Sequence, residues 1–215
     1  MRRLVRFDPL RIFSFSLNLS FLAIHERSMS NPVALIIVDM QRGMLPENTG
    51  PRNNPGAEDN IARLLEAWRE RNLPVIHVRH MGRWPGGAFW PGSEKCEFQP
   101  RFEPLPHEHR LEKNVNDAFS NSGLERWLRV RDISRLVVAG VSTNNSVEAT
   151  VRAAFCLGFD VTLPGDACYT YDKVDILGVP RPAEEWHVTA LSNLHEEYAT
   201  VMSTEAVVSA CRAGG

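Results

Sequence analysis

The sequence is poor in the features that mark metal-binding ribbons, disulfide-stabilised secreted domains and nucleic-acid-binding proteins. Its 215 residues include four cysteines, none in a CxxC spacing, which argues against a zinc ribbon or a disulfide scaffold. Its 24 lysines and arginines are balanced by 26 aspartates and glutamates, and no sustained basic run follows MRRLVR at the start. We therefore expect neither nucleic acid nor a membrane surface as a partner. A reducing, cytoplasmic setting fits this composition best.

A long hydrophobic run is also missing. The apolar stretch near the start, IFSFSLNLSFLAI, is interrupted by serines and an asparagine, and it falls short of the roughly 18 to 20 apolar residues of a membrane span. A signal peptide would need a more compact apolar stretch and a small-residue cleavage site. We interpret residues 1–28 as a disordered extension or a translation start assigned too early, with a targeting signal as the alternative. Residues 29–215 are then a single domain.

From residue 31 onward, two kinds of apolar segment alternate along the chain. Short continuous runs rich in β-branched residues are typical of strands buried on both faces of a parallel sheet, and segments with helical spacing lie between them. We expect strands at 33–39, 74–80, 110–114, 135–141, 159–163 and 200–203, and helices at 57–72, 123–131, 145–157, 182–199 and 204–212. This order predicts an α/β fold, a three-layer αβα sandwich of Rossmann-like type with an approximately six-stranded, mostly parallel sheet.

No GxGxxG motif follows the first expected strand, where DMQRGML stands instead, so a dinucleotide-dependent dehydrogenase is set aside. Ligands of parallel sheets bind beyond the carboxyl ends of the strands. There, Asp39 ends the first strand, Lys113 lies in LEKNVNDAF, and GVSTNNSVEAT leads from residues 135–141 into a helix. Taken singly, Asp39 could cap nearby backbone, Lys113 could be a solvated charge, and residues 142–145 could simply cap the helix.

Taken together, these three segments resemble the isochorismatase-like cysteine hydrolases in their order and in their strand context. The resemblance extends from about Pro32 to about Glu205. It implies a triad of Asp, Lys and Cys, in which a cysteine thiolate attacks the carbonyl of a C–N bond. Asp39 and Lys113 match the first two members, and Ser146 stands where the family has its cysteine.

The resemblance also implies an oxyanion hole made by backbone N–H groups. Its donors would be those of Ser142 and Ser146, beside a cis peptide bond that joins Val141 to Ser142. Backbone N–H groups at the start of a helix lack intrahelical partners, which suits them to bind a developing negative charge. Because members of the family commonly assemble, we also expect a homodimer or a homotetramer.

Serine at position 146 is the main departure from the family pattern. A thiol of pKa about 8.5 becomes a thiolate beside a helix N-terminus and an ammonium group, whereas an alcohol is much less acidic. We therefore expect a chain nearly inactive as an amidase. Three explanations stay open: an engineered replacement of a parental cysteine that traps substrate, which we favour; a natural isochorismatase-type hydrolase that cleaves a vinyl ether with Asp39 as the acid; and a non-catalytic descendant that binds a small molecule.

Metal ligands are scarce where the resemblance would place them. The metal-dependent nicotinamidase branch has an Asp-x-His and a further histidine after the first strand, but the loop MLPENTGPRNNPGAED contains no histidine. His77 and His80 lie on opposite faces of one expected strand, so they do not suit a shared metal ion. We expect no metal and no cofactor.

The expected ligand is a small amide, imide or ureido compound, and the sequence does not choose among these. A long loop rich in proline and glycine follows the second expected strand, and loops of that length tend to be functional. We expect substrate contacts from Gln41, from Trp90 in this loop, and from Asn116 and Phe119 after the lysine.

Overall fold

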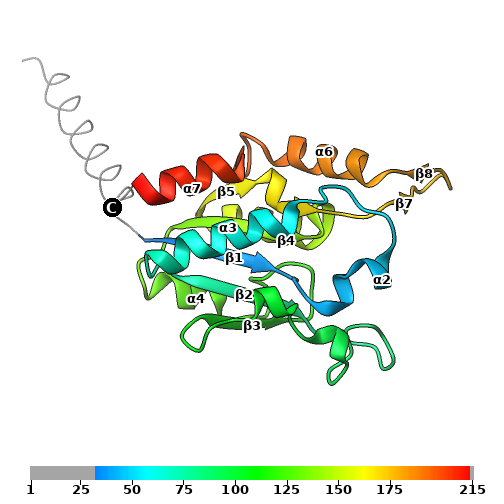
Figure 1. Cartoon of the computed structure of the whole chain (residues 1–215), viewed down its shortest axis with the longest axis horizontal. Helices are drawn as coiled ribbons and strands as arrows, with labels where there is room; N and C mark the ends of the chain where they lie inside the picture. The colour runs from blue at the N-terminus through cyan, green and yellow to red at the C-terminus, as the bar shows by residue number, and fades with distance from the viewer. Residues whose placement is uncertain (1–31, 214–215) are drawn as a thin grey trace, which may run out of the picture. The chain divides into compact units, whose positions relative to one another are not determined.

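The computed structural model of the chain describes residues 32–213, so the expected extension at residues 1–28 and the domain start at residue 29 lie outside the described part. Six strands run through its central sheet, and their bounds are β1 (Val33–Val38), β2 (Val75–His80), β3 (His109–Lys113), β4 (Arg135–Val141), β5 (Asp160–Pro164) and β9 (Thr200–Met202). They lie in the order β3-β2-β1-β4-β5-β9, with every neighbouring pair parallel (Figure 1). The expected six-stranded parallel sheet is confirmed.

Helices cover both faces of the sheet and complete the three expected layers. One face is covered by α3 (Ala57–Glu70) and α7 (Thr204–Ala213). The other is covered by α4 (Leu124–Arg129) and α5 (Glu148–Cys156), with α6 (Ala183–Leu194) packed beside α5. None of the helices described between residues 32 and 213 has the length and apolar character needed to cross a membrane.

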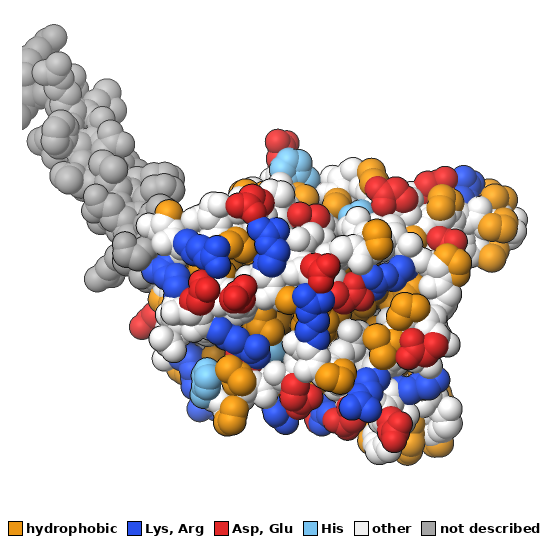
Figure 2. All heavy atoms as spheres, viewed as in Figure 1, with side chains coloured by type: hydrophobic (Ala, Val, Ile, Leu, Met, Phe, Trp, Pro, Cys, Tyr) orange, Lys and Arg blue, Asp and Glu red, His pale blue; other side chains and the backbone are white. Residues whose placement is uncertain are grey.

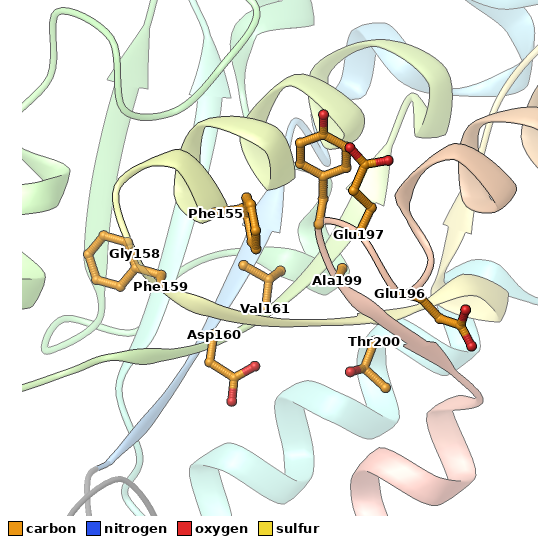
Figure 3. Close-up of a pocket in the computed structure, with 10 residues that line it drawn as sticks. Phe155, Gly158, Phe159, Asp160, Val161, Glu196, Glu197, Ala199 and Thr200 are labelled. Atoms are coloured by element: carbon orange, nitrogen blue, oxygen red, sulfur yellow. The ribbon is translucent and has the colours of Figure 1, made fainter. Parts of the chain in front are cut away.

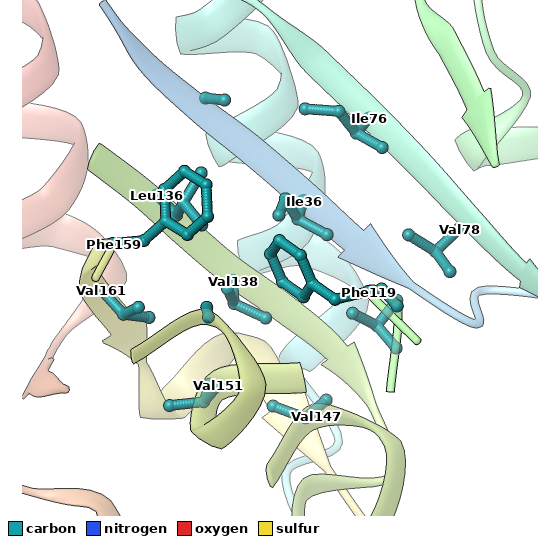
Figure 4. Packing of buried hydrophobic residues seen from close by; sticks show 14 of the residues in the cluster. Ile36, Ile76, Val78, Phe119, Leu136, Val138, Val147, Val151, Phe159 and Val161 are labelled. Atoms are coloured by element: carbon teal, nitrogen blue, oxygen red, sulfur yellow. The ribbon is translucent and has the colours of Figure 1, made fainter. Parts of the chain in front are cut away.

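The central strand β1 contributes side chains to two hydrophobic cores, one on each face of the sheet. Ile36 and Val38 belong to the core under α4 and α5, whereas Leu35 and Ile37 belong to the core under α3 and α7. Figure 4 shows the first core, where side chains of the strands meet Val147 and Val151. Burial on both faces explains why this segment is apolar throughout.

β1 and β4 approach each other closely near their carboxyl ends. Val38 pairs in register with Gly140, whose φ of 130° is unfavourable for any residue with a side chain. A Cβ atom at position 140 would overlap the carbonyl oxygen of Val38 and lie 2.8 Å from its nitrogen. Glycine is therefore required at this position, and it brings the segments that follow the two strands close together.

Several short elements lie in the connections. η1 (Arg42–Met44) and α2 (Pro46–Thr49) follow β1, and the long loop after β2 contains η2 (Glu94–Cys96) and η3 (Pro100–Phe102). After β5, η5 (Gly165–Ala167) leads into β6 (Cys168–Tyr169), which adds a short parallel pairing at the end of β4.

A hairpin that the sequence pattern did not predict extends from the domain after β6. Its strands, β7 (Lys173–Val174) and β8 (Pro180–Arg181), are antiparallel (Figure 1). Figure 2 shows apolar side chains gathered at its end, and the exposed ones are Val174, Ile176, Leu177 and Val179.

A surface hollow of about 510 Å³ lies where β5 and β9 begin (Figure 3). Asp160 and Thr200 mark these strand starts, and Phe155 and Tyr198 contribute aromatic rings to the lining. The hollow is thus at the amino ends of the strands, at the opposite edge of the sheet from the predicted triad.

Candidate active site

The three residues of the predicted triad meet at the carboxyl edge of the sheet. Asp39 directly follows β1, Lys113 is the last residue of β3, and Ser146 lies in the turn between β4 and α5. The Lys113 ammonium lies between the other two, because its Nζ donates to Asp39 Oδ2 at 2.8 Å and to Ser146 Oγ at 3.2 Å. A third contact, to the carbonyl oxygen of Val115 at 3.4 Å, completes the donor set of the ammonium.

All three side chains are buried. Taken as a whole residue, Ser146 is the most accessible of them, with a relative exposure of 7%, against 3% for Lys113 and 1% for Asp39. Burial raises the pKa of Asp39 above its usual value, and the attraction of Lys113 offsets this effect only in part. Asp39 Oδ1 is buried and accepts no hydrogen bond from the described residues. An acceptor left unpaired beside a hydroxyl is suited to receive a proton.

The turn that carries Ser146 has unusual backbone geometry. The peptide bond between Val141 and Ser142 is cis, as the resemblance implied. Residues Thr143–Val147 then form a π-helical turn, η4, in which the Val147 N–H reaches back to the Ser142 carbonyl oxygen at 3.2 Å. Such wide turns are frequent at functional sites. The role of the Ser142 and Ser146 N–H groups as oxyanion donors stays a prediction.

Gln41, an expected substrate contact, is bonded to the backbone of neighbouring segments. Its side chain is fully buried, and its amide is occupied by the backbone of neighbouring segments. Nε2 donates to the carbonyl oxygens of His80 and Cys96 at 2.9 Å each, and Oε1 accepts the His80 N–H at 2.7 Å. A buried amide must find such partners, so Gln41 holds the end of β2 and the long loop in place. A substrate contact for Gln41 stays a prediction.

His80 lies close to the triad, although sequence reasoning assigned it no role there. It pairs in register with Lys113 across β2 and β3, and its imidazole packs edge-on against Phe89 with ring centroids 5.9 Å apart. Burial and the charge of Lys113 lower the pKa of His80, while Asp39 acts in the opposite direction. The sequence could have indicated that His80 lies near the triad, because His80 stands at the carboxyl end of an expected strand.

The other expected substrate contacts occupy different environments. Asn116 is exposed, and its amide donates to Asn145 Oδ1 at 2.9 Å, beside the turn of Ser146. Trp90 is exposed in the long loop. Phe119 is buried in the core of Figure 4, where its ring packs against Phe159 at 5.6 Å. A substrate contact for any of the three stays a prediction.

Sequence reasoning also missed a second histidine, His187, which contacts the turn that carries Ser146. His187 of α6 is buried, and its Nδ1 lies 2.8 Å from the hydroxyl of Thr143, the first residue of η4. Ala183, His187, Ala190 and Leu194 are the buried residues of this helix, spaced three or four positions apart. A histidine within such an apolar stripe needs a buried hydrogen-bond partner. The position of His187 in this stripe was therefore the sequence signal that could have identified it.

His77 is bonded to Glu108 and makes no hydrogen bond to the three triad residues in the described part of the chain. It is fully buried, and its Nε2 lies 2.9 Å from Glu108 Oε2, while Arg69 donates to the other oxygen of Glu108 at 2.7 Å. Burial lowers the pKa of His77 to about 4. Among residues 32–213, no group of three or more His, Cys, Asp or Glu side chains is arranged to hold a metal ion.

Comparison with known proteins places this geometry in a family. Residues 33–206 match the model of the isochorismatase domain. A crystal structure of an isochorismatase-family protein from Chromobacterium violaceum is 45% identical, covers 85% of this chain and 94% of its own, and superposes with a TM-score of 0.81. YrdC, an isochorismatase-family protein of Bacillus subtilis, is 34% identical over 84% of this chain and 97% of its own length. Nicotinamidase 3 of Arabidopsis thaliana is 26% identical over 77% of this chain and 81% of its own. The chain belongs to the isochorismatase family of hydrolases.

Proposed function

We propose that this site is built to hydrolyse a C–N bond in a small amide, imide or ureido compound. Asp39 is the proton carrier, Lys113 is the fixed positive charge, and residue 146 is the nucleophile. The observation that carries the proposal is the position of the Lys113 ammonium, which donates at once to Asp39 and to Ser146 in a buried site. The chain is similar to Nicotinamidase 3, an enzyme that is named for an amide, and this similarity supports a C–N bond as the bond that is cleaved.

The chemistry is clearest for a cysteine at position 146. Its S–H proton passes to Asp39, and the thiolate sulfur attacks the carbonyl carbon while the C=O electron pair moves to oxygen. When the tetrahedral adduct collapses, the C–N bond breaks and the leaving nitrogen takes the proton from Asp39. Water then cleaves the thioester and releases the acid. The unpaired Asp39 Oδ1 is the atom that would hold the proton between these steps.

Serine at this position weakens the first step. The Lys113 ammonium 3.2 Å from Oγ favours an alkoxide, but an alcohol starts from a much higher pKa than a thiol. Loss of a nucleophile from a comparable triad costs on the order of 10⁶ in kcat. In this proposal the chain with Ser146 binds its substrate and turns it over very slowly, whether the serine is engineered or natural.

A second candidate follows from the protonation of Asp39. Since burial raises the pKa of this carboxyl, it is better able to hold a proton and to act as a general acid toward a vinyl ether. This isochorismatase-type reaction needs no thiol, so the chain with Ser146 would be active in it. A binding protein without turnover is the third possibility.

One experiment separates these functions. The chain and its Ser146→Cys variant are each incubated with a library of small amides, imides and ureido compounds, and products are followed by mass spectrometry. The proposal expects hydrolysis by the cysteine variant at least about 10³ times faster than by the chain with serine. A cysteine variant that retains library members but hydrolyses none contradicts the amidase function.

Two controls complete the experiment. Asp39→Asn added to the Ser146→Cys variant should abolish hydrolysis, because the amide cannot carry the proton between nucleophile and leaving group. Isochorismate is tested beside the library: pyruvate release by the chain with Ser146, lost in Asp39→Asn, would select the second candidate instead.

A further inference from the structure

The turn that carries residue 146 is bonded to α6 through a buried pair of side chains. Thr143, the first residue of η4, has no exposed surface, and His187 has 4%. The Thr143 hydroxyl and the His187 Nδ1 atom are 2.8 Å apart. This buried contact links the turn to a helix that lies far away in the sequence and contributes no residue to the triad.

The surroundings of the second ring nitrogen of His187 bear on the direction of this hydrogen bond. The Asn54 side-chain amide nitrogen lies 3.3 Å from Nε2, and it also donates to the carbonyl oxygens of Cys168 at 2.7 Å and Gly165 at 3.2 Å. Because an amide NH₂ group only donates, this contact favours the tautomer in which Nε2 is unprotonated and Nδ1–H donates to Thr143. Burial lowers the pKa of His187, which favours this neutral form.

The next residue of the turn is held by a different set of contacts. Asn144 accepts at Oδ1 from the Thr170 hydroxyl at 2.7 Å and from Lys173 Nζ at 3.3 Å. Lys173 is exposed and Thr170 is buried. The first two residues of η4 are therefore each held by side chains of other segments, and both partners in the α6 contact are buried.

The backbone of this turn departs from regular helix geometry. Asn144 has non-helical φ and ψ angles of −87° and 20°, and the Val147 N–H bonds to the carbonyl oxygen five residues earlier, so side-chain contacts contribute to keeping the turn in this form. If the turn relaxed toward an ordinary α-helix, the residue 146 side chain would rotate about the axis and leave Lys113. At present Oγ is 3.2 Å from Nζ, and a displacement of about 1 Å would end that hydrogen bond.

We infer that His187 is a positioning residue, which acts through Thr143 to hold η4 so that residue 146 points at Lys113 and Asp39. The inference rests on the proposed function, because it assigns His187 to the placement of the nucleophile. It predicts that a cysteine introduced at position 146 depends for its reactivity on the hydrogen bond between Thr143 and His187. That reactivity can be measured without knowing the substrate.

The test uses alkylation of the introduced cysteine in the full-length Ser146→Cys variant by iodoacetamide. The rate is measured by peptide mass spectrometry from pH 5 to 10, so that the four native cysteines are followed separately. Below its pKa a thiol reacts in proportion to its thiolate fraction, and each unit of pKa changes the rate about tenfold. The triad predicts that the introduced thiol has a pKa well below 8.5 and is alkylated faster than the exposed Cys156.

Adding His187→Leu should raise the pKa of the introduced thiol toward 8.5 and slow its alkylation at pH 6.5 by about tenfold or more. His187→Asn should restore the rate to within about threefold, since its amide N–H can donate to Thr143 from a similar place. His107→Leu, the same change at an exposed histidine in the long loop, is the matched control and should leave rate and pKa unchanged.

Thr143→Val provides a second route to the same bond, because it removes the hydroxyl and keeps the shape of the side chain. Thr143→Val should slow alkylation as His187→Leu does. If the leucine variant fails to fold, the alkylation rate of Thr143→Val alone tests the inference. An unchanged alkylation rate and thiol pKa at position 146 in folded Thr143→Val or His187→Leu protein would overturn the inference. A thiol pKa near 8.5 in the Ser146→Cys variant before any second change would instead overturn the proposed function.

Discussion

Replacing Lys113 with methionine should destabilise the fold by about 3–5 kcal/mol at pH 7, because it leaves the Asp39 carboxylate buried without its cation. The two charged atoms are 2.8 Å apart, and both side chains are almost completely buried, with relative exposures of 0% and 1%. At an effective dielectric constant of 20, opposite charges at that distance attract by about 6 kcal/mol. The cost of burying the ammonium offsets part of this attraction, so the expected net loss of stability is about 3–5 kcal/mol.

The loss should depend on pH in a definite direction. Asp39 has a pKa of 3.8 in an unfolded chain and a raised pKa in the fold, so its contribution to stability is complete below pH 3.8 and is lost as pH rises through the folded pKa. Without Lys113 the folded pKa rises further. The difference in unfolding free energy between the two proteins should therefore be large at pH 7.5 and shrink toward pH 4.

Urea unfolding followed by circular dichroism measures both effects. Lys95→Met, at an exposed position, is the matched control and should change stability by no more than about 0.5 kcal/mol. Adding Asp39→Asn to Lys113→Met should recover most of the loss, because a neutral amide replaces the unpaired charge. A loss below about 1 kcal/mol at pH 7, or one that is the same at pH 4 and pH 7.5, would refute the reasoning.

Further changes test the scaffold around the site. Gly140→Ala should cost about 3 kcal/mol or more in urea unfolding, since the methyl group would overlap the Val38 carbonyl oxygen at an unfavourable φ, whereas Gly123→Ala, with open space around it, should cost little. The free energy of unfolding should also fall in acid. The pKa of His77 is lowered from 6.5 to about 4, so protonation of this histidine in the unfolded chain opposes folding once the pH drops below 6.5. The pKa of Glu108 is lowered from 4.5 to about 2, so the stability that Glu108 contributes is lost as the pH falls from 4.5 to about 2. Glu108→Gln should flatten the lower part of this curve, and an unchanged profile would contradict the assignment.

The strands, and the proximity of Asp39, Lys113 and Ser146, were the parts of the molecule that the sequence predicted best. Continuous apolar runs identify strands buried on both faces, and a parallel sheet brings their carboxyl ends to one edge. Together with the family resemblance, this placed Asp39, Lys113 and Ser146 at one location, where the structure has them in contact. The helix expected from residue 145 was correct in place, but its first turn is π-helical.

Features that depend on the approach of distant segments were not predictable in the same way. Gln41 is polar and follows a strand, but nothing in the sequence showed that its amide bonds to the backbone at His80 and Cys96. His187 became relevant only because α6 packs against η4. The hairpin strands β7 and β8 are two residues each, which is too short to give a periodic signal.

The contacts of the Lys113 ammonium have a consequence for substitutions at position 146. Two of its three hydrogen bonds, to Asp39 and to the Val115 carbonyl oxygen, do not involve residue 146. The ammonium should therefore stay anchored when the side chain at position 146 is exchanged. Serine and cysteine can thus be compared at this position within the same surrounding charges and backbone.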